Sequence, residues 1–113
     1  MGALAAGSVV LIPFPFSDLS RTKLRPAVVL ATIDKGDCIL CQITSQPYDT
    51  HAITINEQDF AEGSLQRTSY ARPGKLFTAH ESLLQREAGK LTSPTLHTLR
   101  EQVIRTIRGE TGS

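Results

Sequence analysis

Residues 14–30 read FPFSDLSRTKLRPAVVL and place a polar, basic segment between two apolar runs. The run before it, SVVLIPF at residues 8–14, is too short for a stable helix and rich in β-branched residues, which favours a buried strand. A second such run follows at residues 27–31. Between them, Arg25 precedes Pro26, whose ring fixes its own φ and restricts the residue before it. We therefore expect a rigidly held guanidinium at the start of a strand, a group suited to phosphate recognition.

Further short strands separated by turns are predicted along the rest of the chain. A turn at residues 34–37 makes a hairpin with a third apolar run plausible, and an apolar–polar alternation follows near the middle of the chain. The predicted strands after the turn are residues 38–44, 51–56, 69–72 and 75–78, the last two divided by Pro73-Gly74. Many short strands at close spacing are typical of a small barrel or curled sheet.

The C-terminal part of the chain changes to a helical period. Ser93 can cap a helix, Pro94 suits its first position, and Gly109 is placed to end it. An apolar stripe with helical spacing is formed by Leu96, Leu99, Val103 and Ile107. We expect this stripe to pack on the sheet, which gives one mainly β (α+β) domain over residues 1–113.

Composition narrows the class of protein. No apolar run approaches the ~18 residues of a membrane helix, and the N-terminus lacks the charged region of a secretory signal, so we expect a cytoplasmic protein without a membrane segment. The net charge of +1 argues against a strongly basic nucleic-acid coat. Two local basic clusters nevertheless allow a phosphate-binding surface: Arg21, Lys23 and Arg25, and then Arg67, Arg72 and Lys75.

Cys38 and Cys41 form a C-x-x-C pair, which in other proteins can be a redox pair or half of a zinc site. Here they fall within a predicted strand, where residues three apart point to opposite faces. No second cysteine pair is present to complete a tetrahedral site. We expect two reduced core cysteines, no metal site and no cofactor.

Four segments in this order resemble the MazF/PemK family of toxin endoribonucleases from type II toxin-antitoxin systems. They are GSVVLIPFPFSD at residues 7–18, KLRPAVVL at 23–30, ITS at 43–45 and SYARPGKLFT at 69–78. The resemblance implies an SH3-like curled antiparallel barrel with a C-terminal helix, usually in a homodimer. It also implies metal-independent, sequence-selective cleavage of single-stranded RNA, restrained by a cognate antitoxin protein.

The same resemblance implies roles for three candidate catalytic residues. Arg25 matches the family arginine at the start of the second strand, and we expect it to stabilise charge on the phosphate because a guanidinium stays protonated. Thr44 matches a threonine whose hydroxyl can donate to a phosphate oxygen, and Arg72 matches a basic residue near the scissile phosphate. Two positions beyond Arg72, some members carry an acid, but this chain has Gly74. The identity of the general base is therefore open, with His51 and His80 as substitutes on pKa grounds.

We expect the RNA-binding surface to include the segment between the first two strands, with an aromatic ring stacking on an unpaired base. The residues assigned to it are Phe14, Phe16, Asp18, Lys23, Ser45 and Lys75. Packing of both phenylalanines in the core is the competing interpretation. Ser45 is a weaker candidate than Thr44, because neighbouring residues of a regular strand face opposite ways.

Three other functions compete with an active nuclease. A gyrase-poisoning toxin of the same fold relies on a C-terminal tryptophan segment, and this chain has no tryptophan. A peptide-binding SH3-like module would require an aromatic-lined groove, for which six aromatic residues in all, four Phe and two Tyr, are few. A catalytically weak or inactive relic that binds RNA or antitoxin stays open because of Gly74.

Overall fold

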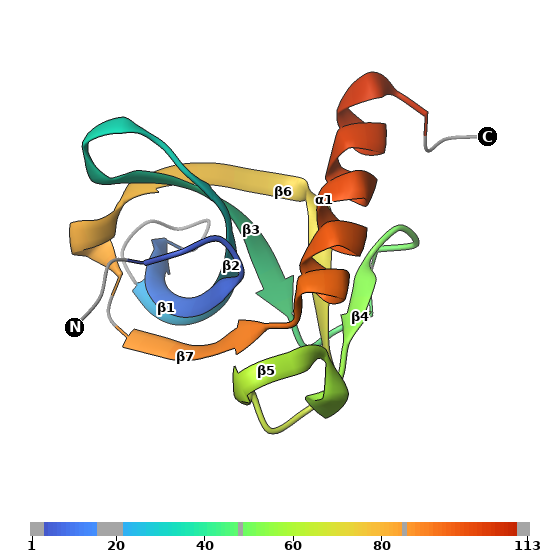
Figure 1. Cartoon of the computed structure of the whole chain (residues 1–113), viewed down its shortest axis with the longest axis horizontal. Coiled ribbons are helices and arrows are strands. Elements are labelled where there is room, and N and C mark those ends of the chain that lie inside the picture. Colours follow the sequence, from blue (N-terminus) through green and yellow to red (C-terminus); the bar gives the residue numbers. More distant parts are fainter. Residues whose placement is uncertain (1–3, 16–21, 48, 85, 111–113) are drawn as a thin grey trace.

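The computed structural model describes residues 4–15, 22–47, 49–84 and 86–110. Its core is one antiparallel sheet of seven strands in the order β4-β6-β3-β2-β1-β7-β5, which curls into a half-barrel beside a single C-terminal helix (Figure 1). The strands are β1 (Ser8–Pro15), β2 (Thr22–Thr32), β3 (Asp37–Thr44), β4 (Ile53–Ile55), β5 (Phe60–Gly63), β6 (Ser69–His80) and β7 (Arg86–Leu91). Three short 3-10 turns, η1 (Asp34–Gly36), η2 (Glu57–Asp59) and η3 (Glu81–Leu83), join some of them. This architecture confirms the predicted mainly β fold.

Strands β1, β2 and β3 follow one another in the sheet, with Val28 opposite both Val9 of β1 and Cys41 of β3. Strand β6 continues the sheet beyond β3, and β7 extends it beyond β1. The pairing of β3 with β6 shifts register between Cys41 and Ile43, opposite the part of β6 that contains Pro73 and Gly74. In Figure 1, β6 first rises beside the helix and then bends to run along the upper edge of the sheet.

Side chains alternate along these strands and supply two apolar clusters, one on each face of the sheet. The cluster facing α1 (Ser93–Arg108) includes Val28, Ile43 and Ala71 together with Leu99 of the helix. The second cluster includes Val29 and other buried residues and lies on the opposite face. Its remaining buried members are Val10, Ile12, Ala27, Cys38, Leu40 and Ala79.

Helix α1 begins one residue earlier than the predicted cap would allow. Its N-cap is Thr92, whose hydroxyl accepts a hydrogen bond from the Thr95 backbone N–H at 3.3 Å, so the assignment of the cap to Ser93 was wrong. Ser93 is instead the first helical residue, and a proline still stands in the first turn. Gly109 ends the helix at φ 78°, as expected from its freedom to adopt the left-handed conformation.

The predicted apolar stripe of α1 is only partly buried. Leu99 and Val103 are buried, and Leu96 packs against the same cluster. The side chain of Ile107 is 71% exposed, because it lies in the last turn of α1, where the helix runs beyond the sheet (Figure 1). No helix in the described part of the chain is both long and apolar enough to cross a membrane.

The strand assignments differ from the sequence prediction in three places. Strand β2 begins at Thr22, so Lys23 lies in a strand rather than in the segment between strands, and Arg25 lies inside β2 rather than at its start. The segments 69–72 and 75–78 belong to one strand, β6, because Pro73 is buried within it and a local shift of register accommodates the Pro-Gly pair. Strands β5 and β7 were missed, since their sequences, FAEG and REAGKL, are polar and glycine-containing and become strands only by pairing with each other and with β1.

Both cysteines are free and buried, and they face opposite clusters as the strand pattern predicted. Cys41 donates from Sγ to the carbonyl oxygen of Arg72 at 3.0 Å. Burial is the main cause that raises the pKa of Cys41 to about 12, and it also raises the pKa of Cys38. Both thiols are therefore held in the protonated, unreactive form.

The raised pKa of Cys41 predicts a stability change with pH. The folded chain holds the Cys41 proton more tightly than the unfolded chain does. The resulting contribution to the free energy of unfolding is fully present below the ordinary thiol pKa of 9.0 and is lost as pH rises toward about 12. We expect Cys41→Ala to flatten the fall in the free energy of unfolding between those two pH values. Urea titrations of wild type and Cys41→Ala across this pH range would measure the free energy of unfolding, and the same slope in both proteins would contradict the raised pKa of Cys41.

The buried, protonated thiols should also resist alkylation in the native protein at pH 8.

Candidate active site

The sheet opens between β2 and β3 at the position of the predicted site. Pairing of these strands ends at Ala27 opposite Gln42, beyond which β2 stays paired with β1 and β3 stays paired with β6. Pro26, the next residue of β2, has no backbone N–H with which to continue a ladder to β3. A cavity of about 200 Å³ occupies the opening.

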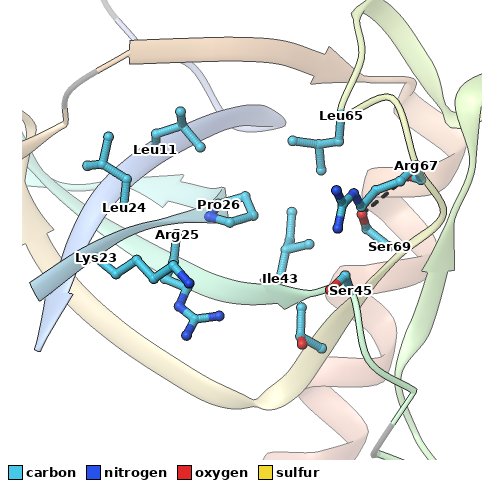
Figure 2. A pocket seen from close by; sticks show the side chains of 11 residues that line it. Leu11, Lys23, Leu24, Arg25, Pro26, Ile43, Ser45, Leu65, Arg67 and Ser69 are labelled. Atoms are coloured by element: carbon cyan, nitrogen blue, oxygen red, sulfur yellow. Dashed lines mark hydrogen bonds between the residues drawn. The ribbon is translucent and has the colours of Figure 1, made fainter. Parts of the chain in front are cut away.

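The cavity is lined by four of the predicted site residues, Lys23, Arg25, Thr44 and Ser45. Figure 2 labels Lys23, Arg25 and Ser45 among its lining residues. The other lining residues of the cavity were not named individually as site residues from the sequence, although Leu24 belongs to the segment between the first two strands that was expected to contribute. They are Leu11, Leu24, Pro26, Ile43, Leu65, Arg67 and Ser69. Cations and hydroxyls therefore surround an apolar floor at the point where the two strands separate.

Arg25 and Thr44 share one face of the sheet. Arg25 lies opposite Ile12, which belongs to the cluster on the face away from α1. Thr44 follows Ile43, whose side chain belongs to the cluster facing α1. Because successive side chains of a strand point to opposite faces, Thr44 points away from α1, as Arg25 does. The start of β2 and the end of β3 thus present a guanidinium and a hydroxyl from the same side.

The Thr44 hydroxyl is held by the chain that follows it. Its Oγ1 accepts a hydrogen bond from the Gln46 backbone N–H at 3.1 Å. Because the hydroxyl acts as the acceptor in this bond, its own hydrogen stays available to donate. The side chain is thereby positioned to donate to an anionic oxygen in the cavity.

Arg72 does not line the cavity, although it lies near Thr44. It stands two residues along β6 from Tyr70, the partner of Thr44, and so is a diagonal neighbour on the same face. Arg72 Nε lies 3.8 Å from Asp49 Oδ2. Nε is buried and makes no hydrogen bond within the described residues. Lys75, also predicted to contact RNA, is exposed on β6 and lies outside the lining of the cavity.

The carboxylate beside Arg72 comes from Asp49, a residue that sequence reasoning missed. Its Oδ1 accepts from the backbone N–H of His51 at 2.9 Å, and its Oδ2 faces Arg72. At Gly74, where some family members carry an acid, nothing lies within 4 Å of an added Cβ. Asp49 is far from Arg72 in sequence, and no motif signalled the pair.

The two histidines considered as general bases lie outside the cavity lining. His80 pairs with Asp37 at the start of β3, whereas Thr44 is at the end of that strand. His80 Nδ1 accepts a hydrogen bond from the Ser82 backbone N–H at 3.1 Å and so caps η3. This geometry removes His80 as a substitute base. His51 is exposed beside Asp49.

Three predicted RNA-binding residues cannot be placed. Phe16 and Asp18 lie outside the described residues, and for Phe14 the structure describes only the backbone of β1, where it pairs with Lys23. Their contacts with RNA stay a prediction.

A turn at residues 64–68 supplies the wall of the cavity opposite Lys23. In Figure 2, Leu65 and Arg67 extend from this turn toward the cavity, and Pro26 and Leu24 lie across from them. The Ser69 hydroxyl donates to the carbonyl oxygen of Arg67 at 3.3 Å. The basic cluster that includes Arg67 was visible in the sequence, but only the fold distinguishes Arg67 from its neighbours.

A family model described as PemK-like, MazF-like toxin of type II toxin-antitoxin system matches residues 5–107. The chain belongs to this family. The match covers the whole sheet and most of α1, and it confirms the resemblance found from the four sequence segments. Comparison with curated protein sequences gives no match.

Solved structures with the same fold include several toxin chains. An endoribonuclease in complex with its cognate antitoxin from Mycobacterial species is 15% identical over 100% of both chains, with a TM-score of 0.67. The MazE-MazF structure (Form-III) from Deinococcus radiodurans is 17% identical over 97% of this chain and 100% of the other, with a TM-score of 0.72. MazF (Form-I) from the same organism is 17% identical over 96% and 99%, with a TM-score of 0.71. At these identities the likeness shows a shared fold.

Proposed function

We propose that this protein is a sequence-selective endoribonuclease that cleaves single-stranded RNA without a metal ion. The observation that carries the proposal is the joint lining of one cavity by Arg25 and Thr44 in a chain of the PemK/MazF-like family. RNA contains its own nucleophile, the 2′-OH next to each phosphate, so the protein has to orient the reactants and stabilise charge.

In the proposed reaction, the 2′-oxygen attacks the adjacent phosphorus and the bond to the 5′-oxygen breaks. Arg25 donates hydrogen bonds to the non-bridging oxygens as negative charge builds on them, and Thr44 donates a further hydrogen bond. The 2′-OH proton leaves to a base and the 5′-oxygen gains a proton, which yields a 2′,3′-cyclic phosphate and a 5′-hydroxyl end. Lys23 holds the neighbouring backbone as a point charge.

The proposed partners follow from the family and from the related structures. The mycobacterial endoribonuclease named above was solved in complex with its cognate antitoxin, and the Deinococcus radiodurans MazF was crystallised with MazE. We propose that this toxin acts in the cytoplasm, is restrained by a cognate antitoxin protein and works as a homodimer.

The decisive experiment incubates purified protein with a mixed single-stranded RNA in EDTA and maps the cuts. Thr44→Ala should lower the single-turnover cleavage rate about 100-fold, because removing one hydrogen-bond donor to a developing oxyanion costs about 10²–10³ in rate. Thr44→Ser keeps the hydroxyl and should retain most of the activity. Loss of activity in both variants would show that the methyl group and packing matter more than the donor.

A second candidate function rests on Gly74. Because this position carries no acid and Arg72 lies beside Asp49, the second candidate is a domain that binds RNA or antitoxin without cleaving RNA. Wild-type protein that leaves RNA intact in EDTA while still binding it would favour this inactive relic over the nuclease.

A further inference from the structure

The cavity has the character of a site for a flat, partly polar group. Its floor and sides are apolar, formed mainly by Pro26, Ile43 and Leu65. The exposed residues Ser45 and Arg67 and the buried Ser69 add polar groups to the lining. A volume of about 200 Å³ is smaller than the ~300–1,000 Å³ typical of drug-sized ligand sites. It admits a single small ring system.

The turn at residues 64–68 is fixed by polar contacts at both ends. Ser64 Oγ donates to Glu57 Oε2 at 2.6 Å, and the Gln66 backbone N–H donates to Ser64 Oγ at 2.7 Å. Thr68 Oγ1 donates to Asn56 Oδ1 at 2.9 Å. The turn is therefore anchored to the segment around η2. Such anchoring holds a side chain on a loop in a defined direction.

The side chains of Leu65 and Arg67 leave this turn in different directions. Leu65 packs against the apolar cluster that faces α1, and Arg67 projects toward the cavity, across from Pro26 (Figure 2). Arg25 extends away from Arg67 in the same view. The guanidinium groups of Arg25 and Arg67 therefore lie at different parts of the opening between β2 and β3.

We propose that this cavity binds one unpaired base of the RNA, next to the phosphate held by Arg25, and that Arg67 selects guanine there. The inference rests on the proposed nuclease function and adds a base-recognition site to it. Recognition of RNA sequence by proteins relies on splayed bases that stack on flat or apolar surfaces and form hydrogen bonds along their edges.

The chemistry of the lining favours guanine over adenine. Arg67 offers only donors, and a guanidinium fork matches the adjacent O6 and N7 acceptors of guanine. The Ser69 hydroxyl already donates to the Arg67 carbonyl oxygen, so it can offer lone pairs only. Pro26, Ile43 and Leu65 would exclude water from the ring faces. A base presenting paired acceptors satisfies Arg67, whereas adenine presents a donor beside N7.

The test measures base preference by binding, which does not depend on cleavage. A library of 2′-O-methyl RNA, which lacks the nucleophile, is selected on wild-type protein and on variants, and bound sequences are counted. We expect wild type to prefer guanine at one position. Arg67→Ala should reduce that preference roughly 5- to 150-fold, which corresponds to the ~1–3 kcal/mol of one bidentate base contact. The base preferences at the other positions should stay unchanged.

Two further variants separate recognition from charge. Arg67→Lys keeps the positive charge but not the fork, so it should lose the guanine preference while keeping most of the total binding. Arg108→Ala removes an exposed cation at the end of α1 and should change neither. Thermal unfolding checks that each variant is folded, which the exposure of Arg67 leads us to expect.

The outcomes distinguish this inference from the proposed function. Wild type without a guanine preference, or an Arg67→Ala variant with the same motif as wild type, would overturn the base-recognition site even if RNA is cleaved. A guanine preference that depends on Arg67 would support it, even if natural RNA is left uncut and the nuclease proposal fails.

Discussion

Arg25→Ala is expected to lower the single-turnover rate of RNA cleavage about 1,000-fold. Arg25 lies on β2 and lines the cavity at the opening between β2 and β3, and Pro26 restricts its backbone. Removing a preorganised donor to a developing oxyanion costs about 10²–10³ in rate, and the loss of a full positive charge places this variant at the upper end. Rates are measured with saturating enzyme, so that weaker binding does not enter.

Arg25→Lys and Arg108→Ala are the controls. The lysine variant keeps a charge without the planar fork, so its rate should fall between wild type and Arg25→Ala. Arg108→Ala, which removes an exposed cation from the last turn of α1, should cleave as wild type does. A rate for Arg25→Ala within tenfold of wild type would contradict the assigned role.

Gly63→Ala is expected to destabilise the fold by about 2–5 kcal/mol. Gly63 has φ 70°, a conformation that costs a residue with a Cβ roughly 1–2 kcal/mol. An added Cβ would also overlap the Ala88 carbonyl oxygen and lie 2.6 Å from Gly89 Cα, and such overpacking costs typically 1–3 kcal/mol. The change separates β5 from β7 just before the turn that carries Leu65 and Arg67. Urea unfolding measures the stability, and RNA binding should weaken in parallel.

Gly109→Ala provides a matched control for Gly63→Ala. Gly109 has a similar φ of 78°, but nothing lies within 4 Å of the added Cβ. This variant therefore reports the conformational cost alone and should lose only about 1–2 kcal/mol. Equal destabilisation by the two substitutions would mean that β5 and β7 can move apart at no cost, contrary to the tight approach in the structure.

Much of the fold could be predicted because its central strands carry local signals. The apolar runs of β1, β2 and β3 and the capped, periodic helix α1 are recognisable without a partner. Strands β5 and β7 could not be predicted, because their polar, glycine-containing sequences become strands only through pairing across the sheet. The continuity of β6 through Pro73-Gly74 likewise depends on a register shift against β3.

The candidate site was predictable to the extent that its residues lie in a recognisable family segment. Arg25 and Thr44 could be proposed from the sequence, and the fold brings both to one cavity. Asp49 beside Arg72 and the turn bearing Arg67 could not be proposed, since each depends on contacts between segments distant in sequence. Their roles, and those of Arg25 and Thr44, stay predictions for the experiments above.

The most direct test of the account replaces a single 2′-OH in the RNA. After the cuts have been mapped in EDTA, the same RNA is made with one 2′-deoxynucleotide immediately 5′ to a mapped cut. If the neighbouring hydroxyl is the nucleophile, cleavage at that phosphate should disappear while other sites are cut as before, with fragments ending in cyclic phosphate. Undiminished cleavage at the substituted site would contradict the proposed reaction.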